Sequence, residues 1–526
     1  MSTRIISIFM LIIFFAIMIT VGIVTRHRAR TVDGFVLGGR KAGPWITAFA
    51  FGTSYFSAVI FVGYAGQFGW NFGMSATWAG LGNAFIGSLL AWNILGRRTR
   101  IMTQHIDAKT MPDFFGKRFD SVTMKVIASF IVFVFLIPYT ASLYNGLSSL
   151  FGLVFDIPYW AVIAIMAVLT GVYVIFGGYM ATAINDFIQG IIMLFGICAV
   201  IGAVLSANGG LLEATQKLSE VPLDGWAGGA YTSFLGPDPL ALLFVVILTS
   251  LGTWGLPQMV GKFYAIKSEG DIHKGTVIST IFAIIVAGGC YFLGGFGRLY
   301  ADKIQYQASG APLFDTIVPT MLSTLPSLII AVVIVLVLSA SMSTLSSLVL
   351  TSSSTFTLDV IKPMKKKEMD EKSQVSTMRI FIVFFIVISA VIAIIKDSHP
   401  ELTFIAQMMG VSWGALAGSF LAPFLYGLYW KKTTKAACYT CFVWGCTLMI
   451  IQMIISLGGV DISGWGTFLS YIFASSIRSG VLAMVGGLVI VPVVSLFTKR
   501  QDDEKVNELF SCYDEKVSVA KKEALD

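Results

Sequence analysis

Charged residues are scarce in this sequence. Asp, Glu, Lys and Arg make up 12% of its 526 residues, whereas hydrophobic residues make up 56% and the mean hydropathy is +0.81. An ordinary water-soluble domain carries about twice that charged fraction, roughly 25%. The composition therefore excludes a water-soluble globular protein and predicts an all-α polytopic membrane protein.

Residues that bind transition metals or form disulfides are also few. The six cysteines are scattered, which excludes a disulfide framework, and Cys438 and Cys441 have no second cysteine pair or histidine beside them. The four histidines are isolated and form no ligand motif. We find no nucleophile with its base, so we expect neither an enzyme nor an organic cofactor. The net charge of +7 follows from the positive-inside rule and requires no nucleic-acid partner, and no obligate protein partner is evident.

Long apolar runs, in contrast, recur along the whole chain. Residues 3–25 are too long for a signal-peptide core and lack a small-residue cleavage site, so we expect a retained first span with the N-terminus outside. Twelve further spans, for about thirteen transmembrane helices in all, are predicted at roughly 44–69, 74–96, 122–152, 157–178, 183–206, 239–265, 275–299, 326–360, 377–396, 403–429, 435–458 and 472–498. Six of the 36 Lys and Arg residues fall in segments that this scheme places outside, namely Arg4, Lys217, Arg298, Lys303, Lys396 and Arg478. This asymmetry indicates a multi-pass protein of the cell membrane with a cytoplasmic C-terminus.

Two of the spans carry helix breakers near their middle. Gly52 interrupts the second span, and Gly252, Gly255 and Pro257 interrupt the seventh. The two spans are five apart and run in opposite directions, as an inverted repeat of five plus five helices requires, and matched unwound segments indicate a transporter site. The alternative is that both spans are merely kinked helices whose glycines allow close packing. The occurrence of both interruptions at matching positions disfavours this alternative. The expected organisation is a first helix and basic flank at 1–30, a first repeat at 31–206, a second repeat at 207–430, two additional helices at 431–498, and a charged, mobile cytoplasmic tail at 499–526.

Hydroxyl side chains gather where lipid would favour leucine, in the middle of the span at 326–360. The polar face consists of Ala340, Ser343 and Thr344, and Ser343, Ser346 and Ser347 extend it at the same helical spacing. Hydroxyl oxygens in a row suit a weakly bound hard cation, whereas a transition metal would require His or Cys. The alternative is a helix-packing surface of small residues whose hydroxyls bond back to their own helix.

Three motifs resemble those of the sodium:solute symporter family, in the same order. They are Phe35–Arg40 followed by Gly43, Pro44 and Trp45; Gly177 and Gly178 followed by Asn185–Gln189; and Ala340–Ser346. The resemblance covers roughly residues 30–435 and best fits the proline and pantothenate branch. It implies a leucine-transporter-like five-plus-five inverted repeat with broken first and sixth core helices.

The function that this resemblance implies is symport of sodium with a small organic solute by alternating access across the lipid bilayer. An amino acid such as proline is the first candidate, and pantothenate or another small carboxylate is the alternative. A channel or an integral-membrane enzyme is a remote alternative. The oligomeric state stays open.

The resemblance also implies sodium ligands. A first site would use the carbonyls of Thr53, Phe56 and Ala340 and the hydroxyls of Ser343 and Thr344. A second site, present in some members, would use Asp186 with Ser343, Ser346 and Ser347. A tenfold sodium gradient supplies ~1.4 kcal/mol per ion and a potential of ~100 mV adds ~2.3 kcal/mol per charge, so one ion could concentrate a neutral solute roughly 500-fold and two ions about 10⁵-fold. We expect one coupled ion and leave the second open.

Asp186 is a carboxylate within an apolar segment. Inserting such a residue costs ~2.5–3.5 kcal/mol, so it requires either a cationic partner or a function. The alternative is that Asp186 caps the cytoplasmic start of its span. The sequence alone supports both interpretations equally.

The solute is expected near the midplane, between the two broken spans. Its expected lining is Tyr55, Ser57, Thr253, Trp254, Gly255 and Gln258. Tyr55 and Trp254 would form an apolar wall, and backbone N–H groups would hold a carboxylate, since no basic side chain is evident there. The chain departs from the proline symporters at Tyr55, where they carry an acidic residue, and at Thr249 and Thr253, where they carry Trp and Tyr. These differences weigh against proline as the solute and leave the prediction of sodium coupling unchanged.

Overall fold

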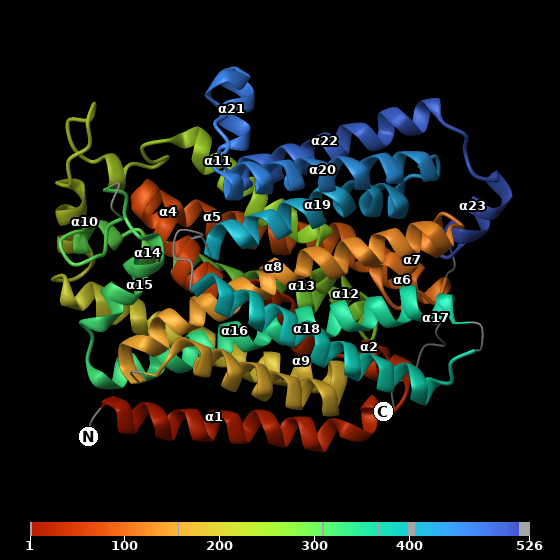
Figure 1. The fold of residues 1–526 in the computed structure, drawn as a ribbon, viewed down its shortest axis with the longest axis horizontal. Helices are drawn as coiled ribbons and strands as arrows, with labels where there is room; N and C mark the ends of the chain where they lie inside the picture. The colour runs from red at the N-terminus through yellow and green to blue at the C-terminus, as the bar shows by residue number, and fades with distance from the viewer. Residues whose placement is uncertain (1–2, 156, 308–309, 366–367, 398–404, 515–526) are drawn as a thin grey trace, which may run out of the picture.

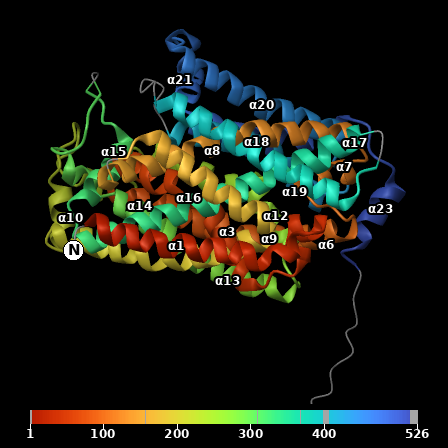
Figure 2. The same ribbon diagram turned by 60° about the horizontal axis from the view of Figure 1, so that its bottom comes forward.

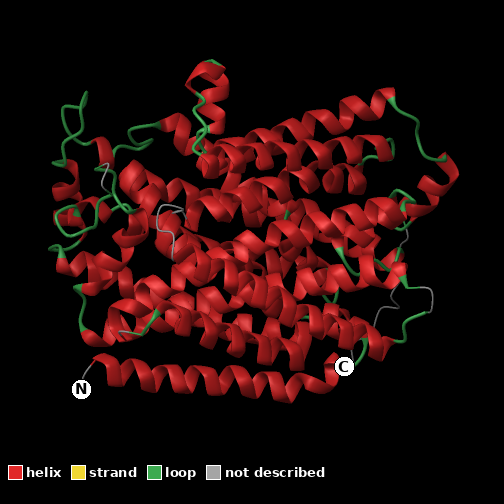
Figure 3. Cartoon of the chain, in the orientation of Figure 1, coloured by secondary structure: helices red, strands yellow, loops and turns green. Residues whose placement is uncertain are grey.

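The computed structural model describes residues 3–155, 157–307, 310–365, 368–397 and 405–514. Within these ranges the chain consists of helices and loops without a β-strand (Figure 3), so the all-α prediction is confirmed. The long helices lie side by side along the longest axis of the molecule (Figure 1). Phe9 and Ile12 on the first helix are each 62% exposed, as expected of side chains that face lipid. Parts of the predicted segments, at 1–2, 156, 308–309, 366–367, 398–404 and 515–526, lie outside the described residues.

The helices follow the predicted spans and add short surface segments. The first half contains α1 (Thr3–Thr25), η1 (Arg26–Ala29), α2 (Val32–Leu37), η2 (Gly38–Arg40), α3 (Pro44–Tyr55), η3 (Val59–Tyr64), α4 (Ala65–Phe72), η4 (Gly73–Ala76), α5 (Thr77–Gly82), η5 (Asn83–Leu90), η6 (Trp92–Gly96), α6 (Arg97–His105), α7 (Met111–Arg118), α8 (Val122–Phe155), α9 (Tyr159–Ala207) and α10 (Leu211–Ser219). The second half contains η7 (Ala230–Thr232), α11 (Pro239–Leu251), η8 (Gly252–Gly255), α12 (Pro257–Ala265), α13 (Gly270–Ala283), η9 (Ile284–Gly288), α14 (Gly289–Gly294), η10 (Gly297–Tyr300), α15 (Phe314–Ser323), α16 (Ser327–Thr355), η11 (Phe356–Ile361), α17 (Lys362–Met364), α18 (Glu371–Asp397) and α19 (Ile405–Tyr429). The remainder contains α20 (Lys435–Gly458), η13 (Ser463–Trp465), α21 (Thr467–Phe473), α22 (Ser476–Phe497) and α23 (Asp503–Ser511).

Among the described residues, ten helices are long and apolar enough to cross a membrane, and eleven if the pair Pro239–Gly255 and Pro257–Ala265, bent by 47°, counts as one span. Two of the ten are long enough to cross a membrane twice: Val59–His105 has 47 residues and Tyr159–Ala207 has 49. Each covers more than one predicted span. The total of thirteen therefore stays a prediction.

The chain reverses direction inside α9, at Gly178. This glycine has φ 54° and ψ −147°, a conformation that side chains other than glycine rarely adopt. Before it, Tyr173 packs against Gly22 of α1. After it, Asn185 donates a hydrogen bond to the carbonyl of Met18, which also belongs to α1. The two arms of α9 therefore run antiparallel, both along α1, as the separate spans at 157–178 and 183–206 predict.

The first sequence motif connects three parts of the molecule. Its residues Gly38–Arg40 all have positive φ, between 54° and 66°. This turn directs the Arg40 guanidinium to the backbone carbonyls of Tyr264 at 3.0 Å, Ala108 at 2.9 Å and Thr103 at 3.3 Å. The motif therefore joins the segment before α3 to α12, to α6 and to the loop after α6.

An ion-pair cluster lies at the same end of the molecule. The Lys125 ammonium is 2.8 Å from Asp113 Oδ1 of α7 and 3.2 Å from Asp359 Oδ1 of η11. Burial raises the pKa of the Asp113 carboxyl, but Lys125 and Lys117 lower it by more, so that its net pKa lies below the usual value. The cluster thus connects the start of α8 with the end of the polar helix α16.

The expectation of a mobile tail was wrong for its first part. Residues Asp503–Ser511 form α23 (Figure 2), and its Val506 and Phe510 are buried. The Arg118 guanidinium lies 5.1 Å from the centre of the Phe510 ring. The two apolar residues are four apart and share one helix face, which packs on the domain in spite of the charged sequence around it.

We expect Gly178→Ala to lower the melting temperature of the purified protein. A Cβ atom there would lie 2.8 Å from the carbonyl oxygen of Phe35, and the backbone conformation adds a strain of roughly 1–3 kcal/mol. Gly202→Ala in the same helix is the matched control, because its Cβ would meet no atom within 4 Å. Equal melting temperatures for the two variants would contradict the reversal at Gly178.

Candidate functional site

The site begins at the break in α3. This helix ends at Tyr55, Phe56 follows with φ −78° and ψ 109°, and helical structure resumes at Val59. An α-helix would pair the carbonyl of Thr53 with the N–H of Ser57, but Ser57 lies outside the helix. The carbonyls at this end of the half-helix carry partial negative charge. The predicted interruption of the second span is therefore confirmed, but it lies after Tyr55, because Gly52 itself is inside α3.

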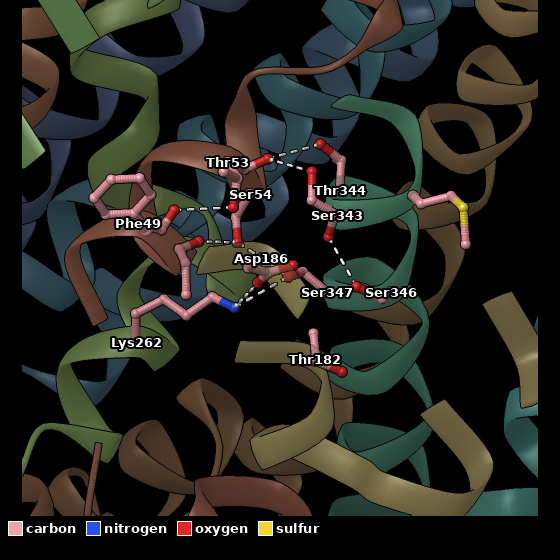
Figure 4. Close-up of polar contacts among 12 residues, drawn as sticks. Phe49, Thr53, Ser54, Thr182, Asp186, Lys262, Ser343, Thr344, Ser346 and Ser347 are labelled. Atoms are coloured by element: carbon pink, nitrogen blue, oxygen red, sulfur yellow. Dashed lines mark hydrogen bonds and ion pairs between the residues drawn. The ribbon is translucent and has the colours of Figure 1, made fainter. Parts of the chain in front are cut away.

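Hydroxyl groups of α16 meet these carbonyls (Figure 4). The Ser343 hydroxyl lies 3.2 Å from the carbonyl oxygen of Thr53, and the Thr344 hydroxyl lies 3.1 Å from the same oxygen. Thr344 is also 3.3 Å from the carbonyl of Phe56. Both hydroxyls lie 3.2 Å from the carbonyl of Ala340 in their own helix. The structure thus brings together all the residues predicted for the first sodium site.

The oxygen set has the chemistry of a site for a hard cation. Its oxygens are neutral, and all its residues are fully buried. Their separations of 3.1–3.3 Å exceed the usual hydroxyl hydrogen bond of about 2.7–2.8 Å. Metal–oxygen distances of about 2.3–2.6 Å, as for calcium, correspond to oxygen–oxygen edges of about 3.2–3.7 Å. In the described part of the chain, no three His, Cys, Asp or Glu residues gather into a metal site.

Asp186 has a cationic partner, one of the two possibilities that the sequence left open, but the identity of this partner was not predicted. The ammonium of Lys262 on α12 lies 3.5 Å from Asp186 Oδ2 and donates a hydrogen bond to the Ser347 hydroxyl at 3.0 Å (Figure 4). The side chains of Lys262 and Asp186 are only 4% and 0% exposed. The capping alternative does not fit, because helical structure resumes at Tyr179, well before Asp186. The signal available in the sequence was a lysine within the apolar span at 239–265.

The residues predicted for a second sodium site divide between two environments. Ser343 contacts the Thr53 carbonyl, whereas Ser347 contacts Lys262. Ser346 donates to the backbone carbonyl of Ser343 at 2.9 Å. Ser347 also lies 3.0 Å from the Ser54 hydroxyl of α3. The Asp186 carboxylate therefore faces an ammonium group that the protein itself supplies.

Comparison with known proteins identifies the family. Residues 35–445 match the family model of the sodium:solute symporter family. The chain belongs to this family. It is therefore a sodium-coupled solute symporter of the membrane and not an enzyme, as the three motifs predict.

Individual relatives agree with the family. The symporter is 26% identical over 494 residues to "Osmoregulated proline transporter OpuE" of Bacillus subtilis (strain 168), covering 93% of this chain and 94% of the relative. It is 28% identical over 450 residues to a "Sodium/proline symporter" of Staphylococcus aureus, covering 84% of each. Among solved structures, a substrate-bound, outward-open Na+-coupled sialic acid symporter superposes with a TM-score of 0.71 at 16% identity, covering 95% of this chain and 99% of that one. This likeness confirms the leucine-transporter-like fold.

Several residues predicted to bind the solute instead make packing contacts within the symporter. Thr253 and Trp254 donate hydrogen bonds to the carbonyls of Gly87 at 3.2 Å and Ile86 at 3.0 Å, so their polar atoms serve helix packing. A Cβ atom on Gly255 would lie 2.7 Å from the Cα of Ala417, so this glycine allows α19 to approach closely. Ser57 is buried at the break of α3.

Tyr55 and Gln258 remain as polar groups that could contact a solute. Both are buried, and within the described residues neither the Tyr55 hydroxyl nor the Gln258 amide has a hydrogen-bond partner. Gln258 also lines a cavity of about 50 Å³ together with Lys262 and Ser347. The second broken span presents Gln258 immediately after its break at Leu256.

Proposed function

We propose that this symporter carries proline, or a closely similar small amino acid, into the cell together with sodium by alternating access. The convergence of the α3 carbonyls with the α16 hydroxyls is the observation that supports a sodium site. The two relatives described above, which are named as proline transporters, support the solute. Sodium is a transported substrate in this scheme and is released after each cycle.

Sodium binds to the carbonyls of Thr53, Phe56 and Ala340 and to the hydroxyls of Ser343 and Thr344. These oxygens come from α3 and α16, so the bound ion holds the unwound segment against the polar helix. The ligands are neutral and are aided only by the negative end of a half-helix, so the ion leaves readily when the two helices separate.

The solute lies beside the two helix breaks. α12 begins at Pro257, and the N–H groups of Met259 and Val260 donate to the carbonyl of Leu256 at 3.0 Å, so the positive end of the helix dipole is what favours a carboxylate there. The unpartnered amide of Gln258 and hydroxyl of Tyr55 add hydrogen bonds to it. Thr253, Trp254, Gly255 and Ser57 shape the surrounding wall.

The symporter lies in the cell membrane with its N-terminus outside and its C-terminus in the cytoplasm. The end of the molecule that carries α6, α7, α17 and α23 is the cytoplasmic one (Figures 1 and 2), because α6 has the basic sequence RRTRIMTQH. The segments 31–206 and 207–430 form the two inverted repeats. Residues 1–30 and 431–498 add peripheral helices.

Uptake of labelled proline into proteoliposomes tests the proposal. An inward sodium gradient should drive uptake that an equal potassium gradient does not, and unlabelled proline should compete. Pantothenate serves as the comparison solute. Sodium-dependent uptake of pantothenate without uptake of proline would contradict the proposed solute, whereas uptake without any need for sodium would contradict the proposed site.

We expect Ser343→Ala and Thr344→Ala to raise the half-saturating sodium concentration about tenfold or more. Losing an interaction with a charged group costs roughly 1.5–3 kcal/mol. Ser341→Ala is the matched control, because the Ser341 hydroxyl is buried in the same helix but has no hydrogen-bond partner among the described residues. Equal effects of all three substitutions on the sodium dependence would contradict the ligand assignment.

We expect Gln258→Leu to raise the KM for proline while the half-saturating sodium concentration, measured by binding without solute, stays unchanged. The substitution keeps the approximate volume and removes the amide, at an expected loss of roughly 0.5–1.5 kcal/mol per hydrogen bond. Kinetics of uptake at saturating sodium measure the effect. A variant with a wild-type KM for proline would place the solute elsewhere.

A further inference from the structure

The surroundings of the Lys262 ammonium have the composition of a binding site for a monovalent cation. The group lies 3.5 Å from Asp186 Oδ2 and donates to the Ser347 hydroxyl at 3.0 Å (Figure 4). It also stands 5.4 Å from the centre of the Tyr179 ring. A carboxylate, a hydroxyl and an aromatic face are groups that attract a positive charge. These groups come from α9 and α16, whereas the lysine comes from α12.

Asp186 and Ser347 are also the residues on which a second sodium ion would depend. A sodium ion bound to them would stand beside the ammonium group, and like charges repel strongly in a buried site of low dielectric constant. One carboxylate would then face two cations. With Lys262 in place, the charge of Asp186 is already balanced, so a second sodium ion gains little there.

We propose that the Lys262 ammonium permanently takes the place of a second sodium ion, so that one sodium ion enters each transport cycle. The inference rests on the proposed sodium site at Thr53, Ser343 and Thr344. Because the ammonium is tethered to α12, it stabilises the contact between three helices without crossing the membrane. The driving force is then that of one ion, which corresponds to roughly 500-fold accumulation of a neutral solute and not to about 10⁵-fold.

Binding of ²²Na⁺ to the purified full-length protein tests this inference without any solute. We expect one ion per wild-type chain and two ions per Lys262→Met chain. Methionine keeps much of the side-chain length and removes the charge. Lys262→Arg, which keeps the charge, and the double variant Lys262→Met with Asp186→Asn, which removes both charges, should each bind one ion.

Thermal unfolding provides a second readout that also detects a poorly folded variant. Sodium should raise the Tm of Lys262→Met by more than that of wild type, with choline as the reference cation, because sodium then takes over the neutralisation of Asp186. The double variant restores the wild-type response. Equal sodium-dependent shifts in wild type and Lys262→Met would overturn the inference.

The outcomes separate this inference from the proposed sodium site. Two sodium ions on the wild-type chain, or one ion with wild-type affinity on folded Lys262→Met, would overturn the inference and leave the first site intact. Binding of no sodium to wild type, Lys262→Met or the double variant would overturn the proposed first site, and the inference with it.

Discussion

Backbone polar groups that lose their helical partners inside a bilayer must find others, and this constraint organises the structure. α3 stops at Tyr55, and the carbonyls of Thr53 and Phe56 find the hydroxyls of Ser343 and Thr344. The partners belong to opposite halves of the chain. α3 and α16 therefore depend on each other. The hydroxyls of α16 are hydrogen-bond partners for the carbonyls freed at the end of α3, and these carbonyls complete the oxygen set proposed to bind an ion.

Two kinds of polar group share the interior, and they behave differently. The Thr53 cluster is neutral, so a cation can enter and leave it at moderate cost. The Asp186–Lys262 pair carries full charges at 0% and 4% exposure, and removing either partner would leave the other buried and unpaired. Such a pair suits a permanent contact between α9, α12 and α16. The proposed site for a transported ion and the contact of the Lys262 ammonium thus lie on the same helix, α16.

The features that could be predicted from the sequence have local signals. Pro257 directly follows the second break and Gly52 lies four residues before the first, helical spacing places Ser343 and Thr344 on one face, and Gly178 marks a reversal between two apolar runs. The features that could not be predicted depend on tertiary contacts. Lys262 pairs with a carboxylate from another part of the chain, and in the sequence it looks like one more basic residue near the cytoplasm.

The direction in which side chains point was the other feature that could not be predicted from the sequence. Thr253 and Trp254 lie next to the break in the seventh span, as expected, but their donors reach the carbonyls of η5. Spacing does not reveal which neighbour a helix face meets. The docking of α23 could not be predicted for the same reason, because it depends on a contact between Phe510 and Arg118, which are far apart in the sequence.

The two polar sites are physically connected, which bears on how ion binding is coupled to solute. Ser54 follows Thr53 in α3, and its hydroxyl lies 3.0 Å from that of Ser347, which in turn accepts a hydrogen bond from Lys262. In the proposed function, a sodium ion at the Thr53 carbonyl would fix α3 against α16 and thereby keep Ser54 and Ser347 in contact. The same contact fixes Lys262 and with it α12, the helix that presents Gln258. In this arrangement the transported ion orders one side of the solute site directly and the other side through the tethered ammonium.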